Sequence, residues 1–194
     1  MKELDKVANQ TMDKKTTISY YLICFFILSV IGWLIEVTES FLRLRIFDNR
    51  GFMFGPFVPI YAFGALLIYF TLRKLVKKQV KVWKINVMPL FLFIVIVIVT
   101  TALEYAVSWF LEIIFDRTWW YYGYESFQLH GRIMLKTSLF FGVAGLLYLY
   151  IVEPIMKKML LKLKKIQLIF ISIVLMSIFM TDIVISIIGH WTNR

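Results

Sequence analysis

Five segments of this chain are rich enough in apolar residues to lie inside a membrane. A helix needs about 20 such residues to cross a hydrocarbon core roughly 30 Å thick, and hydrophobic residues make up 60% of the 194-residue sequence. The sequence therefore predicts an all-α polytopic membrane bundle, a single domain over residues 18–189 between a basic segment at 1–17 and a short tail at 190–194. The predicted spans are residues 18–41, 54–72, 87–115, 135–155 and 166–188.

Basic residues decide the predicted orientation of these spans. Five spans place the two ends of the chain on opposite sides, and the side of the N-terminus also holds the second and fourth connections. That side has 15 of the 22 Lys and Arg residues, so the positive-inside rule assigns it to the cytoplasm and the C-terminus to the outside. With its four acids the inner side carries +11, whereas the outer side, with seven basic and eight acidic residues, carries −1.

Glu104 lies within the most hydrophobic span, residues 87–115. An ionisable side chain near the middle of a bilayer costs roughly 2.5–3.5 kcal/mol, so it usually serves a partner, a cavity or a reaction. Glu104 follows about 17 residues of helix, which raises it roughly 25 Å from the cytoplasmic surface. We expect Glu36, near the outer end of the first span, at a similar height, and Asp182 of the fifth span adds a third carboxylate to this half.

The second span opens with an irregular sequence, RGFMFGPFVPIY. Proline is tolerated only in the first turn of a helix, so a helix is predicted to begin near Pro56 and to be too short for a full crossing. Irregular backbone before it requires cover from protein or a water-filled cavity, and its free N–H groups would favour an anion. Arg50, Gly51 and Gly55 are therefore ligand-binding candidates, and a simple Gly/Pro turn at the membrane surface is the alternative.

The connection at residues 116–133, DRTWWYYGYESFQLHGRI, combines aromatic rings with charged side chains. Its rings fit an interfacial aromatic belt, and the alternative is an aromatic wall or lid over an outer cavity. Arg and Glu side chains in a partly dehydrated region are expected to pair, because unpaired charges there are costly. Structural pairing alone would also explain the pattern. The ligand-binding candidates of this region are Glu112, Trp119, Trp120, His130 and Arg132.

Several kinds of chemistry have no support in the sequence. The histidines show no metal-ligand spacing, so no metal site is predicted, and the single cysteine, Cys24, allows no intrachain disulfide. The sequence contains neither a G-x-x-x-x-G-K-[ST] segment nor a nucleophile elbow, and we predict no cofactor. The lysine-rich connections flank membrane helices, so we interpret them as topology signals with affinity for anionic lipid and not as a nucleic-acid surface.

Four blocks of sequence resemble a known family of bacterial integral membrane proteins, the Putative ABC-transporter type IV family of CmpB-like permeases. The blocks are IGWLIE at 31–36, RGFMFGPFVPIYAFGALL at 50–67, LEYAVSWFLEIIF at 103–115 with the following Trp pair, and FQLHGRIMLKTSLFFGVAGLL at 127–147. The resemblance implies a permease in the bacterial cytoplasmic membrane with a separate ATPase or other membrane subunit as partner. The blocks contain Glu36, Arg50, Glu104, Glu112, Trp119, Trp120 and Arg132.

Three functions fit these features. The first is a permease-type or substrate-handling subunit with an outward-facing polar pocket of Glu and Arg, working with an energising partner. The second is a membrane-embedded enzyme for a lipid-linked or amphipathic anionic substrate at the outer leaflet, with Glu36 or Glu104 as general acid or base. The third is a structural accessory subunit in which the charges only hold helices together. The sequence leaves the substrate and the oligomeric state open, including a homo-oligomer.

Overall fold

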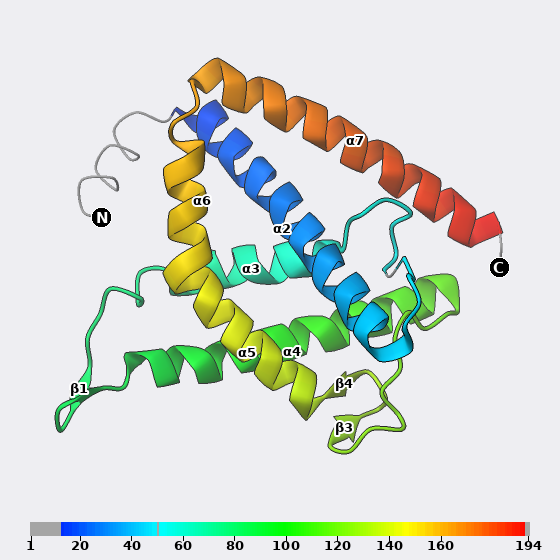
Figure 1. Cartoon of the computed structure of the whole chain (residues 1–194), viewed down its shortest axis with the longest axis horizontal. Coiled ribbons are helices and arrows are strands. Elements are labelled where there is room, and N and C mark those ends of the chain that lie inside the picture. Colours follow the sequence, from blue (N-terminus) through cyan, green and yellow to red (C-terminus); the bar gives the residue numbers. More distant parts are fainter. Residues whose placement is uncertain (1–12, 50, 193–194) are drawn as a thin grey trace. The chain divides into compact units, whose positions relative to one another are not determined.

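The structure, a computed structural model, describes residues 13–49 and 51–192. Within this part, four helices are long and apolar enough to cross a membrane, at Lys14–Leu44, Met88–Phe115, Leu135–Leu160 and Lys165–Thr192, and a shorter apolar helix lies at Pro59–Leu72. The prediction of an all-α membrane protein with a short second helix is confirmed. In chain order the elements are α2 (Lys14–Leu44), α3 (Pro59–Leu72), β1 (Lys81–Val82), β2 (Ile85–Asn86), α4 (Met88–Phe115), β3 (Gln128–Leu129), β4 (Ile133–Met134), α5 (Leu135–Leu147), the π-helical turn η1 (Tyr148–Val152), α6 (Glu153–Leu160) and α7 (Lys165–Thr192) (Figure 1).

The chain divides into two compact units, which we describe separately. Unit 1 consists of residues 1–62 and 153–189, and unit 2 of residues 63–152 and 190–194. Unit 1 therefore holds α2, the loop that follows it, α6 and most of α7. Unit 2 holds most of α3, all of α4 and α5, and the two short hairpins.

In unit 1, α2 begins at a side-chain cap. The carboxylate of Asp13 accepts hydrogen bonds from the backbone N–H of Thr16 at 2.9 Å and from the Thr16 hydroxyl. Such a cap satisfies N–H groups that have no partner inside the helix. The Thr16 bonds hold the pKa of Asp13 below its usual value, and the charges of Lys165 and Lys15 lower it further. The first residue of α7 therefore lies near the start of α2.

The second helix begins at Pro59, three residues later than predicted. A residue before proline avoids the helical conformation, and Val58 instead donates its N–H to the carbonyl of Ser29 on α2 at 3.0 Å. Proline suits the first position of a helix because its φ is preset and it has no N–H to satisfy. The 14 residues of α3 span only about 21 Å, which is short of a full crossing.

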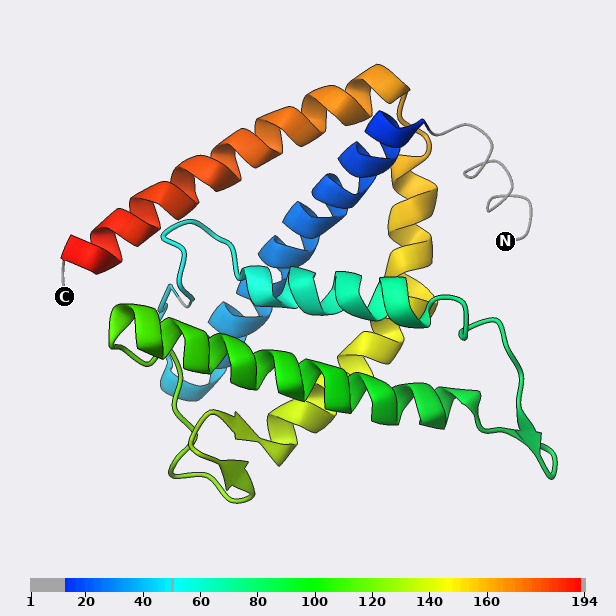
Figure 2. The same cartoon turned by 180° about the vertical axis from the view of Figure 1, so that it is seen from behind.

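In unit 2, two glycines of α5 allow it to lie close against α4. A Cβ at Gly142 would lie 2.5 Å from the Phe93 ring and 2.6 Å from the Val97 side chain, and a Cβ at Gly145 would lie 2.6 Å from Ile96. Small residues permit such approaches between membrane helices, where van der Waals packing replaces the hydrophobic effect. Figure 2 shows α3 and α4 side by side, and Gly64 of α3 faces Leu103 of α4.

The buried face of α4 changes character along its length. Every fourth residue is buried, which is the spacing of one helical face. In order along the helix these residues are Met88, Leu92, Ile96, Thr100, Glu104 and Ser108. The first half of the face is apolar and packs on α5, whereas the second half is polar and needs hydrogen-bonding partners.

The glycine contacts predict opposite effects for one substitution at two sites. Gly142→Ala would push the methyl group into the Phe93 and Val97 side chains of α4 and is expected to lower the free energy of unfolding by about 1–3 kcal/mol. Gly64→Ala is the matched control, because its Cβ would meet Leu103 at an ordinary 3.6 Å and the helix would gain roughly 0.5–1 kcal/mol. Thermal unfolding in detergent measures both. Equal stability of the two variants would contradict close packing at Gly142.

Candidate functional site

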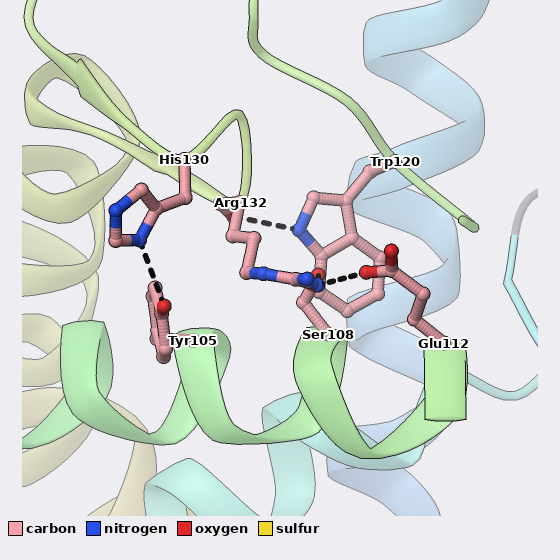
Figure 3. A network of polar contacts seen from close by, with 6 residues as sticks. All are labelled: Tyr105, Ser108, Glu112, Trp120, His130 and Arg132. Carbon is pink, nitrogen blue, oxygen red and sulfur yellow. Dashed lines mark hydrogen bonds and ion pairs between the residues drawn. The ribbon is translucent and has the colours of Figure 1, made fainter. Parts of the chain in front are cut away.

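The polar half of α4 faces the connection that follows it, and together they form the candidate site of unit 2. We call the six residues drawn in Figure 3 the α4 network: Tyr105, Ser108, Glu112, Trp120, His130 and Arg132. Three of them lie on α4, and the other three belong to the connection between α4 and α5. Figure 3 shows the connection passing over α4, with Arg132 pointing toward Ser108 and Glu112 and His130 standing over Tyr105.

A short hairpin positions the connection. Strands β3 and β4 pair antiparallel through Gln128 with Met134 and Leu129 with Ile133. His130 and Gly131 between them both have positive φ, 54° and 68°, and the turn closes with a bond from the Arg132 N–H to the Leu129 carbonyl. Positive φ at both central residues is the pattern of a type I′ hairpin turn, in which glycine is favoured. The His-Gly sequence of the turn therefore determines where Arg132 lies as the chain leaves the turn.

Arg132 bonds within the connection through its backbone and to α4 through its side chain. Its carbonyl accepts a hydrogen bond from the Trp120 indole N–H at 2.9 Å. Its Nη1 forms an ion pair with Glu112 and a longer contact of 3.4 Å to the Ser108 hydroxyl. The guanidinium carbon also lies 5.9 Å from the centre of the Tyr105 ring, within the range of a cation–π contact. The predicted pairing of Arg and Glu in this region is confirmed for Arg132 and Glu112.

His130 and Tyr105 form a second link between the hairpin and α4. The Tyr105 hydroxyl lies 2.8 Å from Nδ1 of His130, and the two ring centres are 5.9 Å apart. Either group can donate in this bond, depending on which nitrogen of the imidazole carries the proton. The histidine side chain is exposed, so the link lies at the edge of the α4 network.

Glu104 lies one helical turn before Ser108 on the same buried face. Its side chain is only 4% exposed and accepts a hydrogen bond from the Tyr122 hydroxyl at 3.2 Å. A buried carboxylate is stabilised by such donors, because they replace part of the water that it has lost. The tyrosine comes from the same connection that supplies Trp120 and Arg132.

Trp119 contacts a different set of residues from its neighbour Trp120. Its ring packs edge-on against Phe115, with centres 5.4 Å apart, and the guanidinium of Arg117 lies 5.7 Å from its centre. Trp119 also contacts the ring of His190, which belongs to the same unit, at 5.4 Å. The two tryptophans therefore differ in role, since only Trp120 joins the α4 network.

Glu36, the candidate of unit 1, is half-buried on α2. It accepts a hydrogen bond from the Tyr61 hydroxyl at 2.6 Å, a short bond of the kind that carboxylates form. The Tyr61 ring lies against Gly32, where a Cβ would come within 2.5 Å. Glu36 and Glu104 lie in different units, so their equal height in the membrane stays a prediction.

The irregular loop of unit 1 donates backbone hydrogen bonds to side chains of α7. Gly55 donates its N–H to both carboxylate oxygens of Asp182, at 3.0 and 3.1 Å, and Phe54 donates to the Ser186 hydroxyl at 2.9 Å. Asn49 adds a link by accepting from the Trp33 indole N–H and donating to the Phe54 carbonyl. The N–H groups of Phe54 and Gly55 therefore have acceptors on α7, and cover by protein or by a water-filled cavity stays a prediction for the rest of the loop. The acidic group that binds the Gly55 N–H is the chain's own Asp182.

The remaining candidates of this loop are Arg50 and Gly51. Arg50 lies outside the described residues. Gly51 has a φ of 113°, which side chains other than hydrogen rarely adopt, so glycine is required there for conformation. A ligand-binding role of Gly51 and Gly55 stays a prediction.

Several residues of the site carried only a weak signal in the sequence. Ser108 lies midway between Glu104 and Glu112, so a period of four along α4 could have identified it. Tyr61, Tyr105 and Tyr122 contribute single hydroxyl groups to partners 18 or more residues away in the chain, and no local pattern indicates such pairs. Among residues 13–49 and 51–192, no group of three His, Cys, Asp or Glu side chains is placed to hold a metal ion.

The contact between Asp182 and Gly55 predicts a graded response to substitution. Asp182→Ala leaves the Gly55 N–H without its acceptor and is expected to lower the free energy of unfolding by about 1–3 kcal/mol. Asp182→Asn keeps a carbonyl oxygen at the same place and should retain most of the stability. Thermal unfolding in detergent compares the two variants. An Ala variant as stable as the Asn variant would show that the loop does not depend on this bond.

The ion pair of the α4 network predicts a measurable coupling. A double-mutant cycle with Glu112→Gln and Arg132→Met is expected to give a coupling energy of about 1 kcal/mol, because the side chains are only 39% and 18% exposed. The pair Glu39 and Arg43 on α2 is the matched control, at 3.7 Å and more than half exposed. Its cycle should give a few tenths of a kcal/mol at about 0.1 M salt. Equal values for both pairs would contradict a protected pair in the network.

A family model matches residues 23–187, which is most of the chain. Comparison with curated proteins and with solved structures gives no significant match. The chain belongs to the family described as Putative ABC-transporter type IV, and it is a multi-pass membrane protein of that family.

Proposed function

We propose that this member of the family is a permease-type or substrate-handling subunit whose substrate contacts the α4 network. In this proposal the network lines an outward-facing polar pocket in the bacterial cytoplasmic membrane, and a separate ATPase supplies the energy. The family resemblance supports the transport role. The concentration of charged and aromatic side chains at one end of α4 supports the location of the pocket.

The proposal rests on the N–H donors of Arg132 that have no hydrogen-bond partner among the described residues. A guanidinium has five N–H donors, and the partners of Arg132 in the described part of the chain are bound at Nη1. The side chain is 18% exposed, and in our proposal Nε and Nη2 are the nitrogens that meet the ligand. An anionic group of a substrate would bind these two nitrogens in the bidentate geometry that Arg favours, and the Glu112 pair would remain intact.

Aromatic rings beside Arg132 suit a substrate with an apolar or sugar-like part. The Trp120 indole N–H bonds to the Arg132 carbonyl, and the centre of the Tyr105 ring lies 5.9 Å from the guanidinium carbon. Rings in this position pack against apolar surface. We therefore propose an amphipathic anionic substrate, in which the anionic group meets Arg132 and the apolar part meets the rings.

The proposed orientation follows from charge. The connections with most Lys and Arg face the cytoplasm by the positive-inside rule, which puts the α4 network on the outer side. Because the sequence has no phosphate-binding loop, the chain cannot hydrolyse ATP through such a site. The energising partner is therefore a separate protein, and we expect it to bind on the cytoplasmic side.

Purification from native membranes tests the proposal. We expect mass spectrometry to identify an ATPase at stoichiometric amount and a bound small molecule with an anionic group. Arg132→Gln should lose the small molecule and keep the ATPase, because the substitution removes donors in the site and leaves the cytoplasmic side unchanged. Arg117→Gln is the matched control, since it removes an exposed Arg of the same connection, and it should keep both.

The same samples separate the alternative functions. Absence of an ATPase at every purification stage would contradict the permease. Conversion of an added lipid-linked substrate that Glu104→Gln abolishes, with unchanged thermal stability, would indicate an enzyme in its place. A Glu104→Gln variant that only loses stability or membrane abundance would indicate a structural subunit.

A further inference from the structure

A second feature of unit 2, separate from the proposed transport site, is the hairpin between α3 and α4. Its strands pair through Lys81 with Asn86 and Val82 with Ile85. The Asn86 side chain accepts hydrogen bonds from the N–H groups of Val80 and Met88, both at 3.2 Å, so it joins the base of the hairpin to the first residue of α4. The hairpin is therefore fixed to a membrane helix by side-chain bonds as well as by the chain.

One face of this hairpin is apolar and exposed. Directly opposed residues of an antiparallel pair point to the same face, so Val82 and Ile85 share a face while Lys81 and Asn86 lie on the other. Val82 and Ile85 are exposed, and Trp83 at the turn is 98% exposed. A two-stranded hairpin is marginally stable in water without something that covers its apolar face. We therefore expect another surface to cover the apolar face of the hairpin.

The charge around the hairpin identifies the kind of partner. Residues 73–84 contain six basic residues and no acid. All four lysines from position 77 onward are exposed: Lys77, Lys78, Lys81 and Lys84. Exposed lysines beside exposed apolar residues suit a surface that is both negatively charged and apolar at shallow depth. An anionic lipid leaflet has both properties.

The chain itself places a lipid leaflet within reach. The hairpin connects the end of α3 at Leu72 to the start of α4 at Met88, and both helices are apolar. We infer that the hairpin docks on the headgroup region of an anionic leaflet, with Trp83, Val82 and Ile85 in the interface and the lysines beside lipid phosphates. Tryptophan is enriched at this depth of a membrane, and each lysine near such a surface strengthens the contact roughly fivefold.

A fluorescent probe at the turn tests this inference. The full chain with Trp83→Cys in a Cys24→Ala background would carry an environment-sensitive dye, one copy per nanodisc, in phosphatidylcholine alone or mixed with phosphatidylglycerol. We expect blue-shifted emission and protection from aqueous iodide in the mixed lipid. Both effects should decrease in phosphatidylcholine alone and in about 1 M salt, where the screening length falls to roughly 3 Å.

Two controls complete the experiment. Replacing Lys77, Lys78, Lys81 and Lys84 with Gln should abolish the response to phosphatidylglycerol. A dye at Tyr124→Cys, a residue 96% exposed in the other hairpin connection, should not respond to lipid composition. A Trp83 probe that stays accessible to iodide in both lipids would overturn the inference. Protection that requires an added ATPase would overturn it as well, because the partner would then be a protein.

Discussion

The need to satisfy polar groups within the chain itself determines how both units are built. A polar group left without a partner in hydrocarbon costs several kcal/mol, and the loop before α3 carries several backbone N–H groups outside any helix. Asp182 and Ser186 of α7 accept two of these N–H groups, and the Ser29 carbonyl of α2 accepts a third. The loop and the two helices therefore form one hydrogen-bonded arrangement.

In unit 2 the same constraint divides α4 into two parts. The first half of its buried face is apolar and contacts α5, where Gly142 and Gly145 allow close packing. The second half carries Glu104 and Ser108, and the connection after α4 supplies their partners. Tyr122 and Arg132 are positioned by a hairpin with a glycine turn. The polar face of α4 and the ordered connection thus depend on each other.

The membrane helices could be predicted because the length of an apolar segment follows directly from the local sequence. The predicted starts of the third, fourth and fifth spans lie within one residue of the observed helices α4, α5 and α7. The predicted start of α3 was wrong by three residues, because Val58 bonds to Ser29 of another helix. The pairing of Arg and Glu followed from the cost of unpaired charge, whereas the contacts of Tyr105 and Tyr122 join residues distant in the chain and have no local signal.

The sequence by itself determined the class of the protein, its apolar helices and the charged residues that needed partners. Composition and spacing are enough to show which segments are buried in the membrane and which charged side chains are costly to bury there. Only the tertiary structure decided which partners those residues have. Gly55 and its neighbours were expected to offer free N–H groups to an anion, and the fold assigns Asp182, 127 residues away, to that position. A hydrogen bond requires its atoms within about 3 Å, and only the folded chain brings such residues together.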